Sequence, residues 1–175
     1  MTQETRPIWT IGHSTRRFPE FLSLLEENAI EVLADVRRFP ASRRYPQFGQ
    51  EQLSTALGAA GISYIHFPEL GGRRSARPDS PNTAWRNAAF RGYADYMMTS
   101  EFLAGMARLT GIAEKERTAI MCAEAVWWQC HRSLIADFLK SKTWEVIHIL
   151  APHKIQEHPY TSAARVLNGK LHYVA

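Results

Sequence analysis

The chain has 175 residues, of which 45% are hydrophobic and 22% charged, a composition typical of soluble globular proteins. We expect a single domain over residues 1–175, with a core from about 7 to 150 and a C-terminal extension over 151–175. No apolar run reaches the roughly 20 residues that a membrane helix needs, and residues 1–14 contain no apolar signal segment. We therefore predict a cytoplasmic protein without a membrane partner, whose two cysteines are free thiols or ligands rather than a disulfide framework.

The net charge of +4 is unevenly distributed along the chain. Sixteen of the 21 basic residues are arginines, and nine of these lie between Arg37 and Arg91, against Glu51, Glu69 and Asp79. Guanidinium groups suit bidentate contacts with phosphate or carboxylate. These arginines either form a solvated, salt-bridged surface or bind an anionic partner, and their clustering in loops favours the second interpretation.

Short apolar runs predict five strands, at Pro7–Gly12, Glu31–Val36, Ile62–Phe67, Thr118–Cys122 and Glu145–Leu150. Apolar residues at helical spacing between these runs predict the intervening helices. The expected helices lie at Pro19–Asn28, at Gln50–Ala60, at Ala84–Met98, after a cap at Ser100, and from Cys130 onward.

Strands that alternate with helices predict an α/β fold, in which an open, mostly parallel, Rossmann-like sheet carries helices on both faces. No G-x-G-x-x-G or P-loop motif follows any strand, so no cofactor is predicted. In the tail we expect a short helix around Thr161–Leu167 and a final strand at Lys170–Val174. We interpret His148 as a core or edge residue and three tail histidines as surface residues: His153, His158 and His172.

Reactive side chains follow four of the predicted strands. In an open parallel sheet, ligands bind beyond the carboxyl ends of the strands, so these groups are expected to share one edge although the chain separates them. Loops are polar in any case, which is the alternative explanation. The residues that follow these strands include His13, Ser14, Asp35, Arg37, Arg38, Gly72, Arg73, Cys122 and Glu124.

Cys122 is the candidate nucleophile, because a thiol near helix N-termini and arginines can have a lowered pKa. His13 or His131 would act as its base, and Glu124 would orient that base or act as an acid. The alternative is a buried, inert cysteine at a strand end. The phosphatase arrangement, a cysteine and an arginine separated by five intervening residues, is absent, because Trp128 stands where the arginine would be.

Cys130, His131 and Arg132 occupy the expected start of a helix, where backbone N–H groups favour an anion. Alternatively, Cys130 packs inward and His131 caps a loop. The spacing of Cys122 from this group fits no common zinc pattern, so no metal site is predicted. Trp127 and Trp128 either stack a planar ligand or pack in the core.

Several motifs occur in a fixed order: TIGHS, DVRRFPASRRYPQF, LGGRR, FRGYADYM, MCAE, CHR and IAD. Together they resemble the family known as domain of unknown function 488, over about residues 10–150. The resemblance implies a small bacterial or archaeal α/β protein and supplies no activity. One departure is AVWWQ between MCAE and CHR, where such proteins often contain proline. The resemblance places the family's characteristic positions on His13, Ser14, Asp35, Arg37, Pro40, Ser42, Gly71, Gly72, Arg73, Arg91, Gly92, Tyr93, Cys122, Glu124, Cys130, His131 and Arg132.

The first functional hypothesis is an enzyme that acts on a phosphorylated, nucleotide-like or other anionic substrate, held by Arg37, Arg73 and Arg132. The second is a non-catalytic nucleotide or nucleic-acid binding module in which aromatic residues such as Tyr45 stack bases. The third is a structural role, with the arginine loops packed on a partner subunit. The sequence does not indicate the reaction or the oligomeric state. The remaining expected substrate contacts are Ser14, Asp35, Ser42, Gly72, Tyr93, Cys130 and His131.

Overall fold

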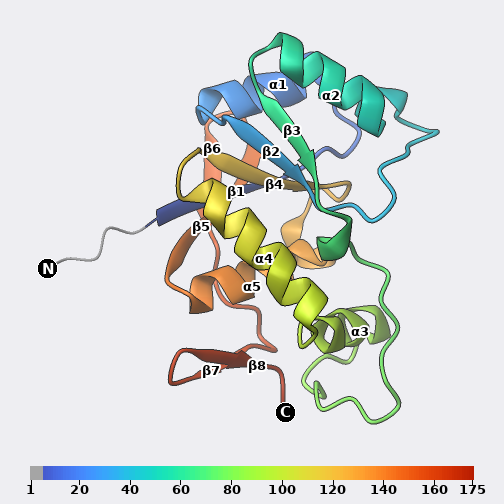
Figure 1. Cartoon of the computed structure of the whole chain (residues 1–175), viewed down its shortest axis with the longest axis vertical. Coiled ribbons are helices and arrows are strands. Elements are labelled where there is room, and N and C mark those ends of the chain that lie inside the picture. Colours follow the sequence, from blue (N-terminus) through green and yellow to red (C-terminus); the bar gives the residue numbers. More distant parts are fainter. Residues whose placement is uncertain (1–5) are drawn as a thin grey trace, which may run out of the picture.

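The computed structural model describes residues 6–175, so residues 1–5 of the N-terminal segment considered above lie outside the described part (Figure 1). Within this range the chain forms a six-stranded sheet in the order β3-β2-β4-β1-β5-β6. The first five strands are mutually parallel, and β6 is antiparallel to β5. These strands are β1 (Arg6–Gly12), β2 (Val32–Asp35), β3 (Ser63–His66), β4 (Thr118–Cys122), β5 (Trp144–Ala151) and β6 (Lys154–Glu157).

Helices cover both faces of this sheet (Figure 1). One face packs against α1 (Phe18–Glu27) and α2 (Gln50–Ala59). The other carries a core cluster with residues of α3 (Ala88–Tyr96), α4 (Ser100–Ala113) and α5 (Arg132–Ser141). The predicted α/β fold with an open, mostly parallel sheet is therefore confirmed.

Strand β4 shows how the sequence specifies two core layers. All five of its residues are buried, and successive side chains of a strand point to opposite faces. Ile120 and Cys122 join the cluster beneath α4 and α5, whereas Ala119 and Met121 join the cluster beneath α1 and α2. The nearly continuous apolar run is what a central parallel strand requires.

Three helices begin later or are capped differently than predicted, and for two of them the capping residue gives the reason. Helix α3 begins later than predicted, because the Asn87 side chain accepts hydrogen bonds from the N–H groups of Ala89 and Phe90. The cap of α4 is Thr99 rather than Ser100, because the Thr99 side chain accepts from the N–H of Phe102. Helix α5 starts at Arg132 and not at Cys130.

The predicted helix around Thr161–Leu167 is wrong. Strand β7 (Arg165–Leu167) pairs with β8 (Lys170–His172) in an antiparallel hairpin instead. Its two-residue loop, Asn168 and Gly169, has φ values of 51° and 74°. An Asn-Gly pair with positive φ at both residues is the preferred connection of a tight hairpin.

The two central strands β1 and β4 lie side by side, but their connections leave in opposite directions. The chain after β1 enters α1 on one face, and the chain after β4 enters α5 on the other. A crevice opens beyond the carboxyl ends of adjacent strands at such a switch point. A Cβ atom on Gly12 would lie 1.8 Å from the Glu124 carbonyl oxygen, so the two loops at this crevice approach each other closely only with glycine there.

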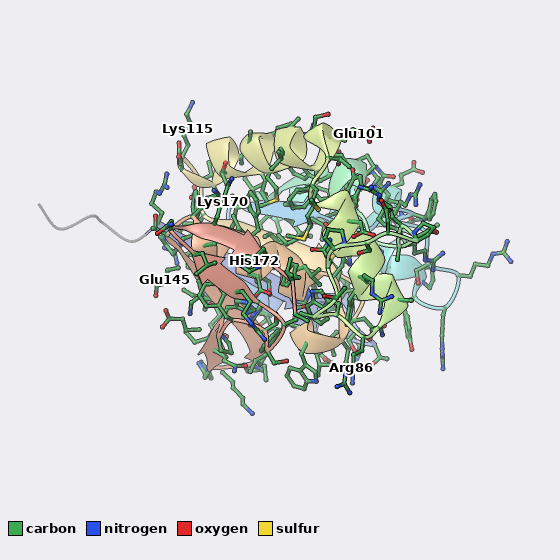
Figure 2. All side chains as sticks on the ribbon, turned by 90° about the horizontal axis from the view of Figure 1, so that it is seen from below. Arg86, Glu101, Lys115, Glu145, Lys170 and His172 are labelled. Carbon is green, nitrogen blue, oxygen red and sulfur yellow. The ribbon has the colours of Figure 1, made fainter. Side chains whose placement is uncertain are left out.

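Charged side chains such as Glu101, Lys115 and Arg86 lie around the outside of the molecule (Figure 2). In residues 6–175, no helix combines the length and the apolar character needed to cross a bilayer.

Candidate functional site

A cavity of about 750 Å³ lies at the carboxyl ends of β1, β2 and β4, where the connections switch faces. Its walls come from the loops after these strands, from the loop after β3, and from the start of α5. The predicted site residues that line it are His13, Ser14, Arg37, Ser42, Gly72, Arg73, Cys122, Glu124, Cys130 and His131. Three others, Asp35, Tyr93 and Arg132, are buried behind its walls.

Asp35 positions Arg37. The fully buried Asp35 carboxylate accepts hydrogen bonds from Arg37 Nε (2.9 Å), from Arg37 Nη2 (2.7 Å) and from the Tyr64 hydroxyl (2.5 Å). Burial lowers the pKa of Arg37, but the hydrogen bonds and charge of Asp35 outweigh it and raise the pKa overall. Arg37 therefore stays charged in the cavity wall, and Asp35 acts through it.

His13 is held as a neutral acceptor. Its Nδ1–H donates to the Ser14 carbonyl oxygen (2.9 Å), so its Nε2 accepts from Arg37 Nη1 (3.4 Å). The ring also stacks on Phe48, with centroids 4.4 Å apart. Burial, together with the Arg37 charge, lowers the pKa of His13 to about 4. A group with this pKa is a weak base at neutral pH, which disfavours the role predicted for it.

The two thiols are in direct contact. Cys122 Sγ at the end of β4 lies 2.7 Å from Cys130 Sγ, and both cysteines are free and buried. Cys130 Sγ also accepts a hydrogen bond of 3.4 Å from the backbone N–H of Arg132, the first residue of α5. A helix N-terminus stabilises negative charge, so this placement favours a thiolate at Cys130.

The two thiols have opposite pKa shifts. Burial, and then the hydrogen bond and charge of Cys130, raise the pKa of Cys122 well above its usual value. Burial also raises the pKa of Cys130, but the Cys122 hydrogen bond and the charge and N–H groups of Arg132 outweigh it and lower the pKa to about 7. This environment favours Cys130 as the nucleophile, whereas the sequence pointed to Cys122.

His131 presents an acceptor nitrogen to Cys130. Its Nε2–H donates to the Val36 carbonyl oxygen (3.0 Å), which leaves the Nδ1 lone pair 3.5 Å from Cys130 Sγ. The Tyr93 ring packs against the imidazole, with centroids 5.1 Å apart, while its hydroxyl donates to the Leu70 carbonyl oxygen. Tyr93 thus supports His131 from the core, where a direct substrate contact had been expected.

Arg132 is also placed differently from the prediction. It is 1% exposed, and its Nη2 donates to the Glu124 carbonyl oxygen (2.7 Å) while Nη1 donates to Thr10 Oγ1 (3.1 Å). The guanidinium therefore holds the loop after β4 from behind and supplies positive charge to Cys130. The Glu124 side chain itself is exposed at the cavity wall.

A buried hydrogen-bonded chain runs from Arg132 to Asp137. Thr10 Oγ1 contacts His148 Nδ1 (2.5 Å), His148 Nε2 contacts His158 Nδ1 (2.8 Å), and His158 Nε2 contacts Asp137 Oδ1 (2.8 Å). A carboxylate only accepts, so His158 donates to Asp137; with both rings neutral, His158 then accepts from His148, which in turn accepts from Thr10. Every donor in the chain therefore points from the cation toward the anion.

This chain involves residues whose positions the sequence misjudged. His158 is 1% exposed, so its prediction as a surface residue is wrong, whereas His153 is exposed as expected. Trp127 is buried and stacks on His148, with centroids 4.6 Å apart and an interplanar angle of 4°. Trp128 is 53% exposed and remains available to a ligand. Asp137 belongs to the IAD motif quoted above, to which no function was assigned, whereas no spacing or motif marks His158 in the sequence.

The cavity is strongly basic. Arg37, Arg38, Arg44 and Arg73 line it, against Glu124 as the acidic residue in its described lining. Sequence reasoning did not single out Arg44, because nothing distinguishes it from Arg43 beside it.

Backbone strain accompanies these groups. Ser14 and Arg73 adopt φ values of 50° and 60°, which non-glycine residues seldom do, and such strain clusters at functional sites. Gly72 lets this loop approach His131, since a Cβ there would lie 3.1 Å from His131 Nδ1. Within residues 6–175, no group of three or more His, Cys, Asp or Glu side chains is arranged to hold a metal ion.

A family model described as Domain of unknown function DUF488 matches residues 17–139. No curated protein and no solved structure matches the chain. The matched region contains Cys122, Cys130, His131 and Arg132 as well as both basic loops, while His13 precedes it. Since the match covers more than half of the sequence and most of the cavity lining, the chain belongs to the family of the domain of unknown function DUF488.

Proposed function

We propose that this protein is an enzyme that uses the Cys130 thiolate to act on a phosphorylated, nucleotide-like or other anionic substrate. The observation that carries the proposal is the position of Cys130 Sγ in the cavity wall, 2.7 Å from Cys122 Sγ and 3.4 Å from the N–H of Arg132. A cavity of about 750 Å³ is in the usual range for small-molecule sites. Two buried free thiols also fit a reducing compartment, which supports a cytoplasmic location.

The proposed mechanism assigns a separate task to each group. Arg37, Arg38 and Arg73 hold the anionic part of the substrate through forked hydrogen bonds. Cys130 Sγ attacks an electrophilic centre beside that anion and forms a covalent intermediate. His131 Nδ1, 3.5 Å from the sulfur, is the acceptor nearest to the thiol proton, but burial lowers the pKa of His131 as well, so the attack relies on the thiolate already present at Cys130.

Glu124 and His13 retain secondary tasks in this mechanism. The Glu124 carboxyl at the cavity wall is available to protonate a leaving group. The neutral His13 keeps Arg37 in place through Nε2. Neither group needs to remove the proton from the nucleophile, because Cys130 has a pKa of about 7.

Alkylation with two reagents tests both the thiolate and the anion site. Iodoacetate is anionic and iodoacetamide is neutral, so the basic cavity should make the ratio of their rates at Cys130 higher than the ratio for free cysteine. Arg73→Ser should lower this ratio, and Arg77→Ser should not, because Arg77 lies outside the cavity lining and pairs with Asp79. An unchanged ratio in Arg73→Ser would count against anion binding at this cavity.

Turnover provides the second test. Phosphorylated and nucleotide-like compounds should be screened with the wild-type protein, and any activity found should be lost in Cys130→Ser while ligand binding persists. Full activity of Cys130→Ser would exclude covalent catalysis by this thiol.

A non-catalytic binding module is the second candidate. Phe39 is 63% exposed and lines the cavity, and Trp128, which precedes the lining residue Gln129 in the chain, is 53% exposed, so both rings are available to stack bases. In this case the affinity for a single-stranded oligonucleotide should fall steeply with salt and should be the same in Cys130→Ser. Salt-independent or absent association would exclude this alternative.

A further inference from the structure

The contact between Cys122 and Cys130 has chemistry of its own, whatever the substrate of the cavity. The two sulfurs lie 2.7 Å apart, and both cysteines line a cavity that opens to solvent. Their surroundings differ, because Cys130 Sγ also faces the Arg132 N–H and His131 Nδ1, whereas Cys122 Sγ otherwise faces the Glu124 carbonyl oxygen at 3.9 Å. Cys130 Sγ thus accepts from an N–H that stabilises negative charge and has a proton acceptor beside it, whereas Cys122 Sγ is beside a carbonyl oxygen, which does not stabilise negative charge.

We propose that Cys130 and Cys122 form a peroxide-reactive thiol pair, in which a hydroperoxide oxidises Cys130 and Cys122 then closes a reversible disulfide. This inference goes beyond the proposed enzyme activity and does not depend on it. Thiols that react with peroxides combine thiolate character and access with a neighbouring cysteine that resolves the product. Cys130 has thiolate character and, although it is only 5% exposed, it lines the open cavity through which a small peroxide can reach it, and Cys122 supplies the neighbouring thiol.

In the first step the Cys130 thiolate attacks the terminal oxygen of the hydroperoxide. An S–O bond forms, the O–O bond breaks, and the departing hydroxide or alkoxide takes a proton from solvent. Cys130 is thereby oxidised by two electrons to a sulfenic acid, and the peroxide is reduced to water or an alcohol.

In the second step Cys122 Sγ attacks the sulfenic sulfur. The S–S bond forms while the Cys122 thiol proton and the sulfenic hydroxyl leave together as water. This step needs no further oxidant, because the summed oxidation state of the two sulfurs does not change. Two equivalents of a low-molecular-weight thiol then restore both cysteines by exchange and are themselves joined in a disulfide.

The order of the two cysteines follows from their environments. Burial and the neighbouring Cys130 raise the pKa of Cys122, so this thiol reacts slowly with a peroxide. Cys130, with its lowered pKa, is ionised to a large extent at neutral pH. Once Cys130 is oxidised, its negative charge is lost, and the neighbouring thiol is already within reach. The disulfide also removes the nucleophile from the cavity.

The first experiment uses the wild-type chain. Protein treated with hydrogen peroxide is alkylated with iodoacetamide, and its intact mass is measured. We expect a loss of two hydrogens and no alkylation, reversed by glutathione, with the Cys122–Cys130 link found after proteolysis. A protein that stays fully alkylatable, or one that forms only intermolecular disulfides, would overturn the proposal. Loss of enzyme turnover is not needed for this result, so the proposal and the enzyme activity are tested separately.

Three variants identify the peroxide-reactive sulfur. Cys122→Ser retains a hydroxyl donor for Cys130 Sγ but cannot form a disulfide, so peroxide should produce a sulfenic acid at Cys130 that dimedone traps. Cys122→Ala lacks the donor as well, so its reaction should be slower at neutral pH. In Cys130→Ser, Cys122 should form little dimedone adduct. Preferential labelling of Cys122 in the wild type during brief peroxide treatment would contradict the proposed order even if a variant fails to fold.

Discussion

Arg132 Nη2 donates a hydrogen bond of 2.7 Å to the Glu124 carbonyl oxygen, so a buried cation at the start of α5 holds the loop that leaves β4. The same guanidinium contributes to the lowered pKa of Cys130. The effect of the Arg132 charge can be separated from the effect of its hydrogen bonds by mutation, because lysine keeps the charge and loses most of the hydrogen bonds.

Arg132→Met should raise the pKa of Cys130, and Arg132→Lys should largely preserve it. Both variants should be destabilised, by about 1–3 kcal/mol for each lost hydrogen bond that leaves a buried group unpaired. The rate of alkylation of Cys130 as a function of pH gives the pKa, and urea unfolding gives the stability. Arg108→Met is the matched control, because Arg108 is half-exposed and pairs with Glu69 on the surface. A Met variant with the wild-type pH profile would show that the Arg132 charge does not act on the thiol.

The stability of the protein should fall as the pH drops below 6.5. Burial is the largest cause that lowers the pKa of His13 to about 4 and of His148 to about 2, and it also lowers that of His131. In the unfolded chain these histidines take up protons near pH 6.5, whereas the folded protein excludes them, so protonation favours unfolding.

Each such histidine should contribute a slope of up to about 1.4 kcal/mol per pH unit in the free energy of unfolding. Urea unfolding between about pH 7 and 4.5 measures this slope, and His13→Gln should make it shallower. A free energy of unfolding that is constant over this range would contradict the prediction.

Asp137→Asn should destabilise the fold by about 3–5 kcal/mol, because it removes a buried charge from its partners. The Asp137 carboxylate accepts from His158 Nε2, from the N–H and Oγ1 of Thr161, and from the Tyr173 hydroxyl. An amide nitrogen would face some of these donors. Thermal unfolding and hydrogen exchange of residues 151–175 report the loss. Asp79→Asn is the control, since Asp79 is exposed and should change stability by less than about 0.5 kcal/mol.

Gly12→Ala should destabilise the fold, because its Cβ atom would overlap the Glu124 carbonyl oxygen. The expected cost is about 1–3 kcal/mol, and the loop that carries Glu124 should shift away from the cavity. Gly58→Ala is a matched test within α2, where nothing lies within 4 Å of the added atom. This variant should be more stable than wild type by about 0.5–1 kcal/mol. Equal effects of the two substitutions would contradict the close approach at Gly12.

The sheet could be predicted because its parallel strands are short apolar runs between helical patterns, as in Thr118–Cys122. The carboxyl-end rule then placed most of the lining residues at one cavity. The hairpin at Asn168 and Gly169 was also readable from the Asn-Gly pair, but apolar spacing at Thr161–Leu167 was given more weight.

The assignment of the reactive thiol could not be predicted. It depends on which sulfur faces the Arg132 N–H. It also depends on the hydrogen bond that His131 makes to the carbonyl oxygen of Val36, a residue distant in the sequence. The role of Arg132 was misjudged for the same reason, because an arginine beside an expected helix start looks the same whether it faces solvent or the core.

The partners of Asp137 lie in residues 158–173, beyond the segment that the family model matches. Through His158, His148 and Thr10 they help to hold Arg132 and, through it, the electrostatic surroundings of Cys130. Exchanging this C-terminal stretch between relatives would therefore change the acidity of the thiol without altering any residue of the cavity wall, because residues 158–173 lie outside the cavity lining.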